Sequence, residues 1–133
     1  MSRFLPENFD PSKPLALVAG QGEYPILLER RARSAGIPLR LIELGGETSD
    51  ELVNEFPEDQ RARLKVGQVG KLLKELIKMK AGYAVMAGRV TPGKLFRGLN
   101  PDLKAIRMLA GLTRRNAETI FGAIGDEIEK AGV

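Results

Sequence analysis

Short runs of consecutive apolar residues alternate along the chain with segments whose apolar residues recur every three or four positions. The strand-like segments are 14–19, 38–44, 61–66 and 83–87. The helix-like segments are 24–35, 51–56, 68–80, 102–112 and 117–128. Strands that alternate with helices favour a parallel sheet with right-handed crossovers. The pattern therefore predicts a three-layer, Rossmann-like α/β domain with a small parallel sheet of about four strands and helices on both faces.

The polarity of individual segments predicts which faces are buried. Segments 14–19 and 83–87 are continuously apolar, as buried strands are, whereas 61–66 alternates like an exposed or edge strand. In segment 24–35, Glu29 and Arg33 fall opposite an apolar face made of Tyr24, Leu27, Leu28, Ala32 and Ala35. In segment 68–80 the apolar stripe is Val69, Leu72, Leu73, Leu76 and Ile77. We expect both stripes to face the core.

The length of 133 residues fits one domain, 14–133, preceded by an extended leader, 1–13. The chain has no apolar run of about 18 residues and no signal-peptide pattern, so we expect a cytoplasmic protein. Cysteine and histidine are both absent. Their absence excludes thiol nucleophiles, Ser-His-Asp triads and histidine-ligated zinc. Carboxylates, lysine, tyrosine, backbone amides or a carboxylate-held metal remain for any catalysis.

The net charge of +4 is unevenly distributed. Segment 61–115 contains fourteen lysines and arginines but only two acids, Glu75 and Asp102. Such a segment indicates either an anionic partner or a solvated basic surface that balances the acidic remainder. Because aromatic residues make up only 5% of the chain and tryptophan is absent, we do not expect a specific nucleic-acid partner.

A glycine-rich junction, Ala19-Gly20-Gln21-Gly22, joins the first predicted strand to the first predicted helix. Glycines allow a tight turn and a close approach to a ligand, and the helix N-terminus attracts anions. Pro25 occupies the place of the third glycine of a dinucleotide fingerprint, so the junction is not a standard NAD site. It predicts either a phosphate-bearing ligand or a turn that only packs.

Two further glycine turns follow predicted strands. Gly67 and Gln68 precede a helix whose first turn contains Lys71, a cation that an anion bound nearby would offset. Gly88 and Arg89 follow segment 83–87, and arginine suits bidentate contact with phosphate or carboxylate. Asp102 is either a helix cap or an orienting partner for Arg89, and the cap is the favoured interpretation.

Four motifs, taken in order, resemble the amino-terminal domain of the LpxI family, the UDP-2,3-diacylglucosamine pyrophosphatases. They are Val18-Ala19-Gly20-Gln21-Gly22-Glu23-Tyr24-Pro25, Val66-Gly67-Gln68-Val69-Gly70-Lys71-Leu72, Met86-Ala87-Gly88-Arg89-Val90 and Pro101-Asp102-Leu103-Lys104-Ala105. The resemblance implies hydrolysis of UDP-2,3-diacylglucosamine to lipid X and UMP in lipid A biosynthesis. It also implies a second, carboxy-terminal catalytic domain, absent from this chain, and Mg²⁺ or Mn²⁺ held mainly outside it.

The predicted substrate-binding residues are Gly20, Gln21, Gly22, Gly67, Gln68, Gly88 and Arg89. No nucleophile and no metal ligand is assigned within the chain. The expected partners are the UDP-sugar lipid, the inner-membrane surface as a peripheral docking site, and either the second domain or a further copy of the chain. The alternative is a stand-alone regulatory module that binds a nucleotide or a phosphate metabolite without catalysis.

Overall fold

The computed structural model describes residues 10, 12–90, 102–112 and 117–133. Four parallel strands form one sheet in the order β3-β2-β1-β4. The strands are β1 (Leu15–Ala19), β2 (Leu39–Leu44), β3 (Arg61–Leu64) and β4 (Tyr83–Ala87). All five residues of β1 are buried, and β3 lies at an edge, as their sequence patterns predict.

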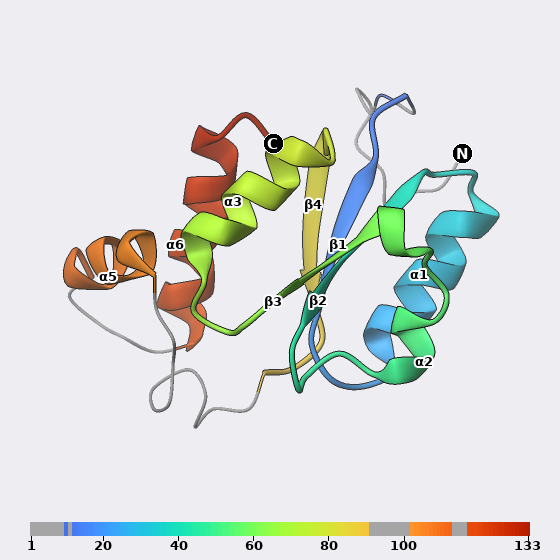
Figure 1. The fold of residues 1–133 in the computed structure, drawn as a ribbon, viewed down its shortest axis with the longest axis horizontal. Coiled ribbons are helices and arrows are strands. Elements are labelled where there is room, and N and C mark those ends of the chain that lie inside the picture. The colour runs from blue at the N-terminus through green and yellow to red at the C-terminus, as the bar shows by residue number, and fades with distance from the viewer. Residues whose placement is uncertain (1–9, 11, 91–101, 113–116) are drawn as a thin grey trace.

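Helices cover both faces of the sheet, which confirms the three-layer α/β prediction (Figure 1). The helices are α1 (Tyr24–Ser34), α2 (Asp50–Val53), α3 (Val69–Lys78), α5 (Leu103–Ala110) and α6 (Ala117–Lys130), with a single 3₁₀ turn at Glu58–Gln60. In Figure 1, α1 and α2 lie on one side of the sheet and α3 and α6 on the other. α5 packs against α3 on the outside of that second layer.

Alternate residues of the strands supply two separate cores, one on each face. Leu17 and Leu41 pack with the layer of α1 and α2, whereas Val18 and Ile42 pack with α3 and α6. Because the sheet is parallel and covered on both faces, its central strands need apolar side chains on both sides. This requirement explains the continuous apolar run of β1.

The predicted inner face of α1 is wrong in part. Tyr24 is 64% exposed and Leu27 55% exposed, whereas Glu29 is buried. Glu29 is tolerated inside because Arg33 Nε donates a hydrogen bond to its carboxylate at 3.0 Å, and the Arg33 guanidinium lies 4.8 Å from the centre of the Phe56 ring. The Arg33 side chain thus pairs with Glu29 within α1 and contacts Phe56 in the turn after α2.

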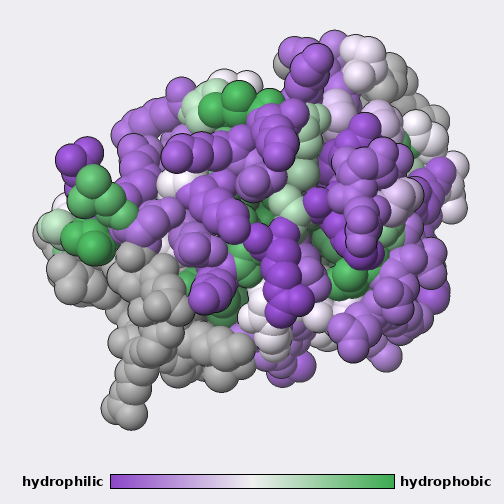
Figure 2. All heavy atoms as spheres, in the orientation of Figure 1, coloured by the Kyte–Doolittle hydropathy of each residue, from purple (hydrophilic) through white to green (hydrophobic). Residues whose placement is uncertain are grey.

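Four other apolar positions are more exposed than their patterns predict. Ile77, at the edge of the α3 stripe, is 59% exposed. Met86 is 38% exposed because β4 is an edge strand of the described sheet and not a central one. On α5, Leu103 and Ile106 are exposed, and hydrophobic atoms lie at the surface over this helix (Figure 2). None of the helices in the described ranges is long and apolar enough to cross a membrane.

Candidate ligand site at the carboxyl edge of the sheet

The carboxyl ends of β1 and β4 lie at the point where the strand order changes direction. From β1 the chain adds β2 and β3 on one side, and β4 then returns to the other side of β1. The helix after β1 lies on one face of the sheet, and the helix before β4 lies on the opposite face. Such switch points open a crevice outside the carboxyl ends of the strands, where α/β folds bind their ligands.

Backbone hydrogen bonds join the two loops that border this crevice. The Gly20 N–H donates to the Ala87 carbonyl at 2.7 Å. Gln21 and Arg89 exchange two bonds: the Gln21 N–H donates to the Arg89 oxygen at 2.6 Å, and the Arg89 N–H donates to the Gln21 oxygen at 3.0 Å. The structure thus brings together Gly20, Gln21, Gly88 and Arg89, which are separated by more than sixty residues in sequence.

Two of the glycines are required by this close approach alone. A Cβ at Gly20 would lie 2.5 Å from the Arg89 carbonyl oxygen. A Cβ at Gly88, whose φ is +92°, would lie 2.8 Å from the Gln21 carbonyl oxygen. Gly22 differs, because its φ is +103° and a Cβ there would meet no atom of the described chain within 4 Å. Packing therefore explains Gly20 and Gly88, whereas Gly22 leaves open space at the start of α1.

No side chain of the described residues caps the N-terminus of α1 through a hydrogen bond. Glu23, the N-cap residue, makes no side-chain capping bond, and the first turn contains no acidic residue. Pro25, within the first two helical positions, lacks an N–H and has φ pre-set for a helix. The positive end of the helix dipole thus lies beside Gly22 at the carboxyl edge of the sheet, where the carboxylate of Glu23 makes no capping hydrogen bond.

The N-terminus of α3 is arranged differently, because Asp102 caps it. Asp102 Oδ2 accepts the Lys71 N–H at 3.1 Å, and Asp102 Oδ1 accepts the Ala105 N–H at 3.0 Å. One carboxylate therefore caps both α3 and α5, which confirms the cap interpretation. Within the described residues Asp102 forms no ion pair with Arg89. The chain thus supplies its own anion beside Lys71.

Gly67 and Gln68 lie at the same edge of the sheet but farther from the β1–β4 crevice. They follow β3, which is separated from β1 by β2. Gln68 Oε1 accepts the Lys65 N–H at 2.8 Å, so this side chain folds back on its own loop. No described hydrogen bond links either residue to Gly20 or Arg89. Their role in binding a ligand stays a prediction.

The turn after β2 adds two residues that the sequence analysis missed. The side-chain amide of Gln21 donates a hydrogen bond to the carboxyl group of Glu47, which is only 4% exposed. Thr48 Oγ1 donates to the Ala19 carbonyl at 2.7 Å and accepts the Leu44 N–H at 2.8 Å. This turn therefore holds the glycine junction in place. An acid soon after the second strand of a Rossmann-like unit is the signal that could have singled out Glu47.

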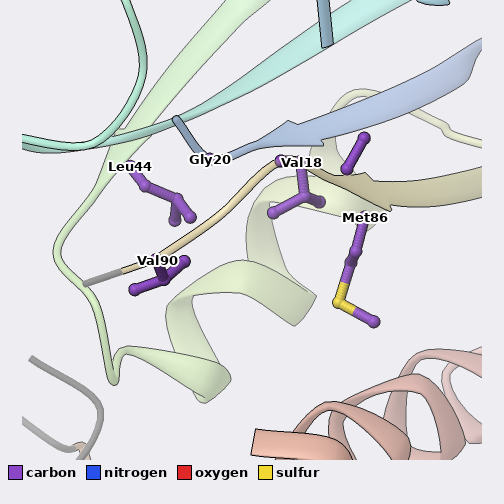
Figure 3. Close-up of a pocket in the computed structure, with 7 residues that line it drawn as sticks. Val18, Gly20, Leu44, Met86 and Val90 are labelled. Atoms are coloured by element: carbon purple, nitrogen blue, oxygen red, sulfur yellow. The ribbon is translucent and has the colours of Figure 1, made fainter. Parts of the chain in front are cut away.

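An apolar cavity of about 220 Å³ lies beside the junction. Its lining residues are Val18, Gly20, Leu44, Met86, Ala87, Gly88 and Val90. Figure 3 shows the labelled side chains of Leu44, Met86 and Val90 pointing into one space on the side of the sheet that carries α3 and α6. Arg89, exposed and with no ion pair to any described residue, stands between two lining residues. The site therefore combines a helix N-terminus, a cation and an apolar wall.

No group of three or more acidic side chains in the described ranges is arranged to hold a metal ion. Two carboxylates near the crevice have other partners. Glu43 forms an ion pair with Arg63 at 3.8 Å, and Glu47 accepts from Gln21. The donors present in this part of the chain do not fit a metal centre.

A comparison with family models matches residues 14–133 to the LpxI N-terminal domain. A comparison with curated proteins finds none that matches the chain. The family match spans every described strand and helix, and it includes all four motifs that carry the sequence resemblance. The chain therefore belongs to the LpxI family, and residues 14–133 are its N-terminal domain.

Proposed function

We propose that this domain binds the nucleotide-sugar part of UDP-2,3-diacylglucosamine at the β1–β4 crevice. In this proposal the domain forms one wall of a pyrophosphatase that releases lipid X and UMP. The residues that contact the substrate are the predicted set at the crevice, above all Gly22 and Arg89. The main catalytic acid belongs to a second domain that faces this wall.

The uncapped N-terminus of α1 beside an unpaired arginine is the observation that carries this proposal. A diphosphate binds to hydrogen-bond donors and positive charge, and the first turn of α1 and the exposed Arg89 offer both without a carboxylate partner among the described residues. Gly22 offers open space for close approach, and Arg89 has no ion pair among the described residues. The internal carboxylate that serves α3 has no counterpart at α1.

The apolar cavity supports an amphiphilic ligand over a fully polar one. A free inorganic phosphate has no group to place against Val18, Leu44 and Met86. A lipid-linked sugar phosphate has both an anionic part and hydrocarbon.

The metal of the proposed reaction is held mainly by the second domain. Mg²⁺ or Mn²⁺ prefers carboxylate oxygens, and two described carboxylates near the crevice, Glu43 and Glu47, are engaged by Arg63 and Gln21. The bound metal would supply charge neutralisation at the pyrophosphate. This chain's own residues bind and orient the substrate and supply no nucleophile.

Calorimetric titration of the 133-residue chain with UDP, UMP, ATP and NAD tests the binding role. We expect UDP to bind best and Arg89→Gln to weaken UDP about tenfold, the loss of one charge-assisted contact. Arg31→Gln, an exposed arginine at the far end of α1, is the matched control and should leave UDP binding unchanged. Equal or tighter binding of ATP or NAD would favour the stand-alone nucleotide module.

Release of UMP by the chain with Mg²⁺ or Mn²⁺ tests whether catalysis requires the second domain. The chain, which lacks the proposed catalytic acid, should bind UDP-2,3-diacylglucosamine but hydrolyse it barely faster than the uncatalysed reaction. Turnover equal to that of a two-domain family member would contradict the proposal.

A further inference from the structure

Helix α5 turns its apolar side to solvent. Leu103 is 63% exposed and Ile106 52% exposed, while Ala105 on the opposite side of the helix is buried. Ala110, also exposed, continues the same line at helical spacing. Figure 2 shows hydrophobic atoms gathered over α5 at the left edge of the molecule. Exposed aliphatic residues are ordinary, so this pair indicates a contact surface only together with the cations on α5 and on the neighbouring α3.

Exposed cations without carboxylate partners among the described residues lie on α5 itself and on the neighbouring helix α3. Arg107 lies one turn after Leu103 on α5, a helix whose sequence contains no acid. The neighbouring α3 exposes Lys71 and Lys74. None of these three cations forms an ion pair with a described residue. By contrast, Lys104 on the inner flank of α5 binds Glu127 of α6 at 2.8 Å.

The stripe and the lysines belong to one rigid unit. Asp102, the residue before α5, accepts the Lys71 N–H and caps α5 through the Ala105 N–H. The Lys104–Glu127 ion pair ties α5 to α6 as well. The orientation of α5 is therefore fixed relative to α3, which approaches it closely at Gly70, the residue before Lys71.

We propose that Leu103, Ile106 and Ala110, together with Arg107, Lys71 and Lys74, form a docking surface for an anionic lipid bilayer. Helices that lie in the membrane interface combine inserted aliphatic side chains with basic side chains at the headgroup level. A second copy of the chain does not suit this surface, since a two-fold contact would bring like cations face to face. The use of this surface to reach a lipid-linked substrate rests on the proposed function, but the surface itself does not.

Co-sedimentation with phospholipid vesicles tests the docking surface. The chain should partition onto vesicles of equal phosphatidylglycerol and phosphatidylcholine, and much less onto pure phosphatidylcholine. The double variant Leu103→Ser/Ile106→Ser should lower the partition coefficient about tenfold, because hydrocarbon burial is lost. Lys71→Gln/Lys74→Gln should lower it about thirtyfold at low salt and have little effect at high salt.

Matched controls lie on the other side of the sheet. Leu27→Ser removes a leucine of α1 that is 55% exposed, and Arg31→Gln removes an exposed cation of the same helix. Both should leave partitioning unchanged. Equal binding to the two kinds of vesicle, or an equal loss in the α1 controls, would overturn the docking surface. A protein that binds the chain through α5 without any vesicle binding would also overturn it.

UDP titration of the same variants separates this inference from the proposed function. The α5 and α3 variants should bind UDP like the wild type, which also shows that they are folded. If the wild type binds UDP but does not bind anionic vesicles, only the docking surface is refuted. Vesicle binding without UDP binding would refute only the proposed function.

Discussion

Replacing Gly20 by alanine would place a methyl carbon 2.5 Å from the Arg89 carbonyl oxygen and 2.9 Å from the Arg89 nitrogen and carbonyl carbon. Ordinary contacts of a Cβ begin near 3.4 Å, so the loop after β4 would have to move by about 0.9 Å. The obstacle is backbone and not the end of a flexible side chain. The loop therefore cannot adapt by a change of rotamer.

The expected cost combines two terms. Overpacking of a well-packed site costs about 1–3 kcal/mol. The shift also disturbs the Gly20–Ala87 bond and the paired bonds between Gln21 and Arg89, each contributing about 1 kcal/mol. We therefore expect Gly20→Ala to lower the free energy of unfolding by about 3 kcal/mol, a large share of the stability of a typical domain.

Urea unfolding followed by circular dichroism measures this loss, with Gly22→Ala as the matched control in the same loop. A Cβ at Gly22 meets open space among the described residues, so only the positive φ is penalised, by about 1 kcal/mol. The order should be the opposite for UDP affinity, measured for the folded fraction of each variant. Gly22→Ala should weaken UDP binding more than Gly20→Ala, because Gly22 is where the ligand is proposed to approach the backbone. A Gly20→Ala variant as stable as Gly22→Ala would refute the reasoning.

Three contacts of the fold make further predictions. The variants Glu47→Ala and Gln21→Ala, singly and together, should show a coupling of about 1 kcal/mol in urea unfolding, and additive losses would contradict their hydrogen bond. Asp102→Ala removes the cap of two helices and should lower the free energy of unfolding by about 2 kcal/mol, whereas the loss of a single cap would be about half. The hydrogen bond from Lys104 lowers the pKa of Glu127 below its ordinary value of 4.5, so the stabilisation is complete above that value and is lost as the pH falls through the folded-state pKa. The difference in unfolding free energy between the wild type and Glu127→Gln should therefore disappear in strong acid, and its persistence there would contradict the ion pair.

The sequence was sufficient to predict the elements and their order, because each strand and helix has its own periodicity. The buried run of β1 and the alternating pattern of β3 led to the correct central and edge positions. The glycine junction was also located correctly, since strand, glycines and helix follow one another directly. The sequence pattern is a reliable guide wherever the structure of a segment depends on that segment alone.

Contacts between segments distant in sequence could not be predicted. Periodicity assigns Glu29 to the polar face of α1, but in the structure it is buried. Arg33 donates a hydrogen bond to its carboxylate and packs over the ring of Phe56. The stripe of α5 has the spacing of a buried face, but α5 is the outermost helix and leaves Leu103 exposed. Likewise, the contact of Glu47 with Gln21 depends on how the turn after β2 folds over β1.

The central claim is that the β1–β4 crevice holds a uridine diphosphate group. Calorimetric titration of the 133-residue chain with UDP tests it most directly, alongside ATP and NAD, for the wild type, Arg89→Gln and Arg31→Gln. The account predicts a preference for UDP that Arg89→Gln weakens about tenfold and Arg31→Gln leaves intact. UDP binding no tighter than that of ATP or NAD, or binding that is indifferent to Arg89, would contradict it.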